Sequence, residues 1–191
     1  MAASLPYPAL HATHAGIWAA SADGEVRALG RGEAIARAAE TPMIMLNAPL
    51  VGQRLGYPEL SGLDLLELFA FVFPARFAVP TPKGVGHALG LGPPTDDAGP
   101  APFLRRAAEA LLERMEVADW PEREGAWASA QSLYRLRWSW APAVTARLKR
   151  PERDERWLFS KLPEWEEGAT RPQPSIVSLS EGESVERLAA L

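Results

Sequence analysis

The sequence contains no cysteine. This absence excludes disulfide bonds, thiolate nucleophiles and the cysteine-ligated zinc sites that are common in small domains. A Gly-x-x-x-x-Gly-Lys-Ser/Thr loop, whose backbone amides and lysine surround a triphosphate, is also absent. Neither Gly84 nor Gly86, close to Lys83, has that spacing. We therefore expect that this chain alone neither hydrolyses ATP nor binds a cofactor.

Long apolar runs are equally scarce. The most apolar stretch, residues 63–80, is interrupted by three charged residues and Pro74, and each charge would cost about 3 kcal/mol in hydrocarbon. Residues 1–16 have no basic segment followed by an apolar core, which argues against a signal peptide. The net charge of −4 does not indicate a protein that coats nucleic acid. The composition predicts a soluble, cytoplasmic protein without a membrane span.

Short apolar segments and turn residues predict an α/β fold in the first half of the chain. Residues 15–20 and 25–29 flank an Asp-Gly turn, which is typical of a β-hairpin. Good helix formers fill residues 32–40, and residues 43–46 form a continuous apolar run typical of a buried strand. This order predicts a small mixed sheet with flanking helices.

Capping residues predict short helices after this sheet. Asp64 and Thr81 have side chains that accept hydrogen bonds from the first turn of a helix. They predict helices over residues 65–72 and 82–89. With the sheet, these helices make an α/β domain over residues 1–92.

The character of the chain changes beyond this point. Residues 93–102 are rich in proline and glycine and predict a linker. Apolar residues then recur at helical spacing and predict a mainly helical, tryptophan-rich extension over residues 103–170. We expect residues 171–191 to begin a connection to a further domain.

Few residues suggest catalysis. Asp64 and Glu67 admit a two-metal nuclease interpretation, since carboxylates that hold Mg²⁺ activate water in such enzymes. A helix cap for Asp64 and an edge position for Glu67 are the favoured alternative. His11 and His14 have metal-ligand spacing but no acidic ligand nearby. The sequence predicts no catalytic residue and no metal ligand.

A basic, aromatic stretch over residues 133–150 contains no acidic residue. Basic side chains neutralise phosphates, and aromatic rings stack on unpaired bases. The candidates for nucleic-acid contact are Arg135, Arg137, Trp138, Trp140, Arg147, Lys149 and Arg150. In the alternative interpretation, the tryptophans fill a core and the arginines pair with acidic residues, since charges balance nine against nine over residues 119–167.

Long runs of the sequence resemble one family. The runs are residues 43–56, 61–72, 74–82, 119–127, 150–159 and 162–167, including Asp-Trp-Pro-Glu-Arg-Glu-Gly-Ala-Trp and Arg-Pro-Glu-Arg-Asp-Glu-Arg-Trp-Leu-Phe. They are similar to the N-terminal region of DinG-like helicases, ATP-dependent DNA helicases of the XPD type in superfamily 2. The resemblance implies an accessory region followed by a helicase motor in cis, which with ATP and Mg²⁺ would unwind DNA during repair.

A second likeness lies inside the first. Leu46-Asn47-Ala-Pro-Leu-Val51 and Asp64-Leu-Leu resemble, in order, the His-Asn-x-x-Phe-Asp and Asp-Thr-Leu motifs of DnaQ-like exonucleases, which have an RNase H-like fold. Val51 stands where the motif has aspartate, and the expected first strand over residues 17–19 has no Asp-x-Glu pair. Since Mg²⁺ requires oxygen ligands, this likeness implies a degenerate fold without its metal site. An active DnaQ-like 3′–5′ exonuclease and a non-catalytic protein-interaction module remain the alternatives.

Overall fold

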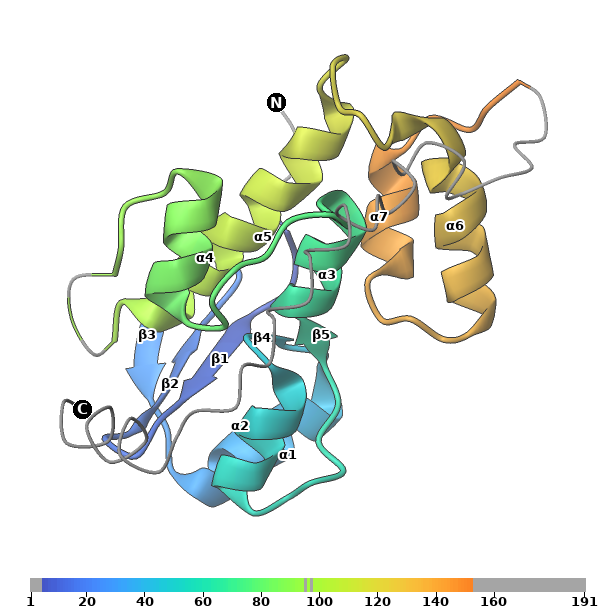
Figure 1. Cartoon of the computed structure of the whole chain (residues 1–191). Coiled ribbons are helices and arrows are strands. Elements are labelled where there is room, and N and C mark those ends of the chain that lie inside the picture. The colour runs from blue at the N-terminus through green and yellow to red at the C-terminus, as the bar shows by residue number, and fades with distance from the viewer. Residues whose placement is uncertain (1–4, 95, 97, 153–191) are drawn as a thin grey trace, which may run out of the picture. The chain divides into compact units, whose positions relative to one another are not determined.

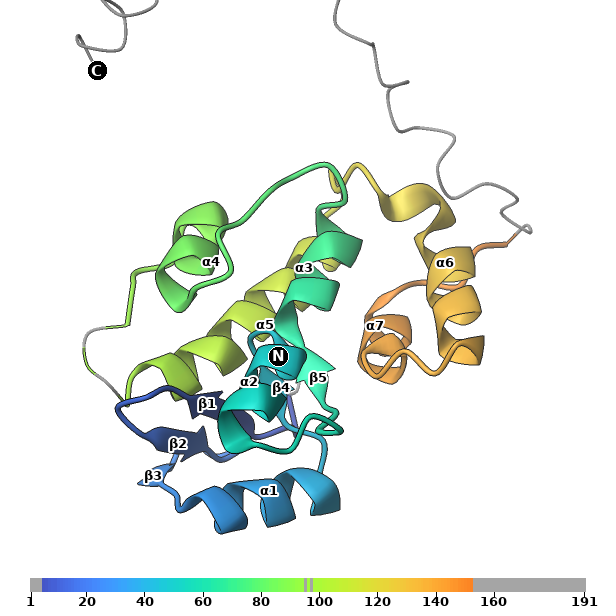
Figure 2. The same ribbon diagram turned by 60° about the horizontal axis from the view of Figure 1, so that its bottom comes forward.

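The computed structural model describes residues 5–94, 96 and 98–152. They form a five-stranded mixed sheet with helices on both faces (Figures 1 and 2). The strands are β1 (Ala9–Ala12), β2 (Ile17–Ala20), β3 (Val26–Ala28), β4 (Ile44–Met45) and β5 (Leu63–Asp64). The helices are α1 (Arg31–Glu40), α2 (Ala48–Leu55), α3 (Leu65–Val72), α4 (Pro82–Leu89), α5 (Pro100–Glu116), α6 (Arg123–Arg135) and α7 (Ala141–Arg147). The predicted α/β class, with a small mixed sheet and flanking helices, is confirmed.

The strands are arranged in the order β3-β2-β1-β4-β5. Strand β2 is antiparallel to both of its neighbours, whereas β1, β4 and β5 are parallel. The C-terminal ends of these parallel strands therefore meet at one edge of the sheet. In open α/β sheets, this edge is where ligands usually bind.

The first strand, β1, is missing from the sequence prediction, which takes residues 17–19 as the first strand. That expectation is wrong, because β1 precedes them and occupies the centre of the sheet. The strand has only four residues, two of them alanine, and it follows Pro6 and Pro8, so its local signal is weak. The predicted hairpin is confirmed as β2 and β3, with Gly24 at φ 96° in the turn between them.

The predicted helix caps are also confirmed. The Asp64 side chain accepts a hydrogen bond from the Leu66 amide at the start of α3, and Thr81 accepts one from the Gly84 amide in α4. The sequence places these helices correctly because a capping side chain acts within three residues of itself.

Alternating residues of the strands supply two hydrophobic clusters, one on each face of the sheet. Ala9 and Ile44 pack with residues of α3 to α7, whereas Leu10 and Met45 pack with residues of α1 and α2. Successive side chains of a strand point to opposite faces, so even these short strands have two buried sides.

Helix α5 packs on the sheet, although the sequence analysis assigns most of it to the extension. Ten of its residues are buried, and seven of them share one hydrophobic cluster with α3 and β1. Arg105 is 9% exposed and donates hydrogen bonds to the Leu5 carbonyl at 2.9 Å and the Tyr7 carbonyl at 3.1 Å. The helix begins at Pro100, inside the predicted linker.

Helix α7 packs against α5, and α6 packs against α7 (Figure 1). Trp140 and Val144 are fully buried in the same cluster as α5, and the Trp120 indole donates to the Val72 carbonyl at 3.0 Å. The rest of the predicted extension, residues 153–170, and the predicted connection over residues 171–191 lie outside the described residues. In the described part, no helix is both long and apolar enough to cross a membrane.

Candidate functional site

The end of the sheet beyond β1, β4 and β5 is the first candidate site. Asp64 lies there with 7% of its surface exposed. Its Oδ2 accepts from the Ala48 amide at 2.8 Å, and its Oδ1 accepts from the amides of Leu66 at 2.9 Å and Asn47 at 3.2 Å. One carboxylate thus holds the first turns of both α2 and α3. This geometry gives Asp64 a structural role.

Glu67, the other member of the acidic pair, also has a protein partner. Its Oε2 accepts a hydrogen bond from the Trp138 indole at 3.0 Å. Partial burial and the nearby Asp64 carboxylate raise the pKa of Glu67, whereas the bond from Trp138 lowers it. The Trp138 ring packs on Phe71, with 5.1 Å between the ring centroids. Glu67 therefore anchors the turn between α6 and α7.

The end of β1 carries basic groups. Arg54, from α2, donates a hydrogen bond from its guanidinium to the Ala12 carbonyl at 2.8 Å. His11 stacks on Trp18 from β2, and its pKa is lowered by burial and by the Arg54 charge. A fixed positive charge beside the end of β1 repels a divalent cation.

The described residues do not contain a group of three or more His, Cys, Asp or Glu side chains placed to hold a metal ion. Val51, at the position of the exonuclease aspartate, is 3% exposed and packs in the cluster with α1. The sheet end therefore combines the hydrogen-bonded Asp64 carboxylate with an imidazole, a guanidinium and a buried valine side chain.

The predicted nucleic-acid contacts have different environments. Trp140 is fully buried and its indole donates to the Asp64 carbonyl, so it has no free face for a base. Arg147 pairs with Glu116 at 2.7 Å, and Trp138 is engaged with Glu67. Within the basic, aromatic stretch over residues 133–150, these three residues therefore connect α7 and the turn before it to α3, β5 and α5.

The other candidates lie on the surface. Arg137 closes the turn after α6 in a left-handed conformation, with φ 63°, and it is exposed like Lys149. Arg135 and Arg150 both line one hollow of about 500 Å³, the α6 hollow. Its polar and aromatic lining consists of Trp127, Gln131, Ser132, Arg135, Arg150 and Glu152.

Sequence reasoning missed Trp127 and Gln131 as candidates. They precede Arg135 at intervals of four residues, which places all three on one face of α6. That spacing is present in the sequence, but Trp127 and Gln131 precede the basic, aromatic stretch over residues 133–150. Arg150 joins the hollow from the segment after α7, and its position follows from tertiary structure.

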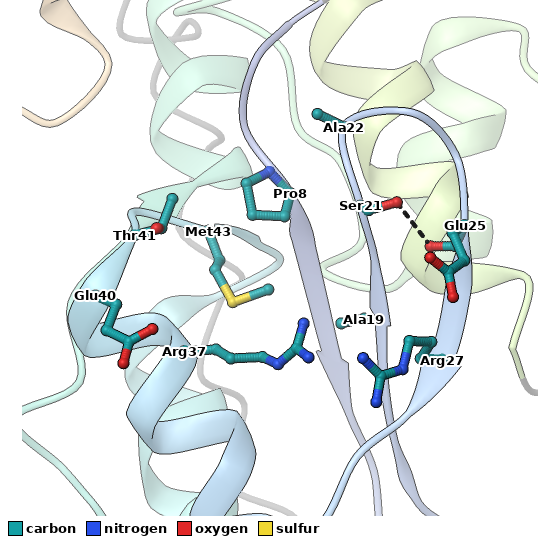
Figure 3. A pocket seen from close by; sticks show the side chains of 10 residues that line it. All are labelled: Pro8, Ala19, Ser21, Ala22, Glu25, Arg27, Arg37, Glu40, Thr41 and Met43. Atoms are coloured by element: carbon teal, nitrogen blue, oxygen red, sulfur yellow. Dashed lines mark hydrogen bonds between the residues drawn. The ribbon is translucent and has the colours of Figure 1, made fainter.

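A second hollow of about 410 Å³ lies between the β2–β3 hairpin and α1. Figure 3 shows the side chains of Arg27 and Arg37 extending into it. Both arginines pair with Glu33, at 3.7 and 3.0 Å. Glu25 and Glu40 also line the hollow. Three carboxylates thus outnumber two guanidinium groups, and this hollow has no net attraction for an anion.

Comparisons with protein-family models, curated proteins and solved structures find no match to this chain.

Proposed function

We propose that this chain is a catalytically silent RNase H-like module and an accessory region of a DinG-like, ATP-dependent DNA helicase. The observation that carries the proposal is that His11 and Arg54, and no acidic side chain of β1, lie at the end of β1 in a five-stranded sheet of order β3-β2-β1-β4-β5. The module would contact or position DNA, while a motor in cis would bind ATP and Mg²⁺.

The topology supports an RNase H-like fold. In such domains three strands precede the first helix, and helices then alternate with the fourth and fifth strands. The described chain has this order from β1 to α3, with β2 alone antiparallel to the other strands. The central strand β1, where DnaQ-like enzymes carry Asp-x-Glu, reads Ala-Leu-His-Ala here.

The chemistry of the sheet end supports loss of catalysis. Hydrolysis by two metal ions requires carboxylates with free oxygen lone pairs. Both oxygens of Asp64 accept backbone amides. Arg54 adds a positive charge nearby. A divalent cation would thus meet a largely buried carboxylate that already accepts three backbone amides, together with a repelling guanidinium.

We expect the purified chain to leave 3′-labelled single-stranded DNA intact in the presence of Mg²⁺ or Mn²⁺. The measurement is the product length on a denaturing gel, with a proofreading exonuclease as positive control. Metal-dependent shortening that co-elutes with the folded protein would contradict catalytic silence and favour the exonuclease alternative.

The helicase assignment makes a separate prediction. The reading frame should continue beyond Leu191 into a Gly-x-x-x-x-Gly-Lys-Ser/Thr loop, because a motor must bind a triphosphate. Sequencing of the downstream gene checks this. A stop codon directly after Leu191 would count against a motor in cis, whatever the outcome of the nuclease assay.

A further inference from the structure

We infer that the α6 hollow binds one nucleotide of an unpaired DNA strand. Arg135 and Arg150 would contact the phosphate, and the base would stack on Trp127. This inference rests on the proposed function and gives it a contact surface away from the sheet end.

The lining of the hollow supplies both kinds of group that unpaired DNA requires. Trp127, Gln131 and Arg135 follow one face of α6, and Arg150 lines the hollow from the separate segment after α7. Two guanidinium groups from different segments can hold one phosphate between them. An aromatic ring on the same face provides a stacking surface, which every base can use.

The local charge favours an anion. Residues 127–152 contain five basic residues and one acidic residue, Glu152, which gives a local net charge of +4 in a chain whose net charge is −4. Arg147 is engaged with Glu116. Among the described residues, no ion pair within 4.0 Å joins Arg135 or Arg150 to a carboxylate. This distinguishes the α6 hollow from the hollow between the β2–β3 hairpin and α1, where Glu33 already pairs with Arg27 and Arg37.

The volume and the lining favour an unpaired strand over a duplex. A hollow of about 500 Å³ is in the range of sites for small ligands, which is about 300–1,000 Å³. A single nucleotide fits that range, whereas a duplex keeps its bases stacked on each other and away from Trp127. The amide of Gln131 and the carboxylate of Glu152 can bond to the Watson–Crick edge of the base, which is exposed only in an unpaired strand.

The test is fluorescence anisotropy of the full chain with a labelled oligothymidylate of about 15 nucleotides, at about 50 mM salt. The double variant Arg135→Glu/Arg150→Glu should weaken binding by at least about tenfold and reduce the salt dependence of the affinity. The matched control is Lys83→Glu/Arg106→Glu, which changes the net charge by the same amount at exposed positions outside the hollow. It should bind within about twofold of the unmodified chain.

Trp127 is tested separately from the arginines. Trp127→Leu should weaken binding at least about fivefold with an unchanged salt dependence, because stacking involves no counterion release. Trp127→Phe should retain most of the affinity, since it keeps an aromatic face. If Arg135→Glu/Arg150→Glu fails to fold, Arg135→Gln/Arg150→Gln replaces it and should weaken binding in the same direction.

Three results would overturn the inference: no binding by the unmodified chain at low salt, equal loss of binding in the double variant and its control, or duplex binding as tight as that of the unpaired strand. None of these measures nuclease activity or the downstream reading frame. Failure of this site is therefore distinguishable from failure of the proposed module and its helicase context.

Discussion

The sheet end and the α6 hollow contain similar residue types in opposite situations. At the sheet end, Asp64 and Arg54 are bonded to backbone groups of the protein itself. In the α6 hollow, Arg135 and Arg150 line an open space and are exposed. The comparison teaches that a charged residue indicates a ligand site only when the fold leaves its bonding groups available, because internal hydrogen bonds compete with those to a ligand.

The largest expected effect comes from breaking the sheet end. Asp64→Ala removes the acceptor for three backbone amides, at 2.8, 2.9 and 3.2 Å, and leaves buried donors without a partner. We expect the free energy of unfolding to fall by about 3 kcal/mol. Urea denaturation followed by circular dichroism measures this change.

Asp64→Asn is the matched control, because its amide oxygen still accepts at one position. It should lose about half as much stability as Asp64→Ala. If Asp64→Ala lowers the free energy of unfolding by less than about 1 kcal/mol, the carboxylate is not needed to hold α2 and α3. Asp64 would then again be a candidate metal ligand.

The smallest expected effect is the pH dependence that His11 contributes. Burial, followed by the Arg54 charge, lowers the pKa of His11 in the folded state below its ordinary value of 6.5. The unfolded chain therefore takes up this proton first as the pH falls. The stability is complete above pH 6.5 and declines as the pH falls below that value. Urea midpoints measured from pH 8 to about pH 5.5 should show this decline.

His11→Gln should reduce the decline, since glutamine does not titrate. Glu67 has the opposite tendency: its pKa is raised in the folded state, so the stability that it contributes increases as the pH falls toward its usual value of 4.5. The two effects are separated by comparing His11→Gln with the unmodified chain, because Glu67 is present in both. An unchanged decline in His11→Gln would mean that the imidazole remains solvated.

Local features of this fold could be predicted and distant ones could not. The hairpin turn at Gly24 and the caps at Asp64 and Thr81 each act within a few residues, so the sequence places them correctly. Strand β1 has a weak local signal and obtains its position from β2 and β4 on either side. Helix α5 has strong helical spacing, but the spacing does not reveal that it packs on the sheet.

The candidate site shows the same limit. The basic stretch draws attention to the correct part of the surface, yet Trp138 and Trp140 are only two residues apart and have different roles. Trp140 is fully buried, whereas Trp138 lies at the edge with Glu67. Composition cannot separate them, because the turn between α6 and α7 decides which ring points inward.

The hydrogen bonds of Arg105 join segments that are far apart in the sequence, which has a consequence for synthesis on the ribosome. Its guanidinium bonds to the Leu5 and Tyr7 carbonyls, about one hundred positions earlier in the chain. The segment that leads into β1 is thus without this support until α5 has emerged, while the β2–β3 hairpin can form early from neighbouring residues. A nascent chain halted before α5 would keep Leu5 uncovered and offer an apolar end to chaperones.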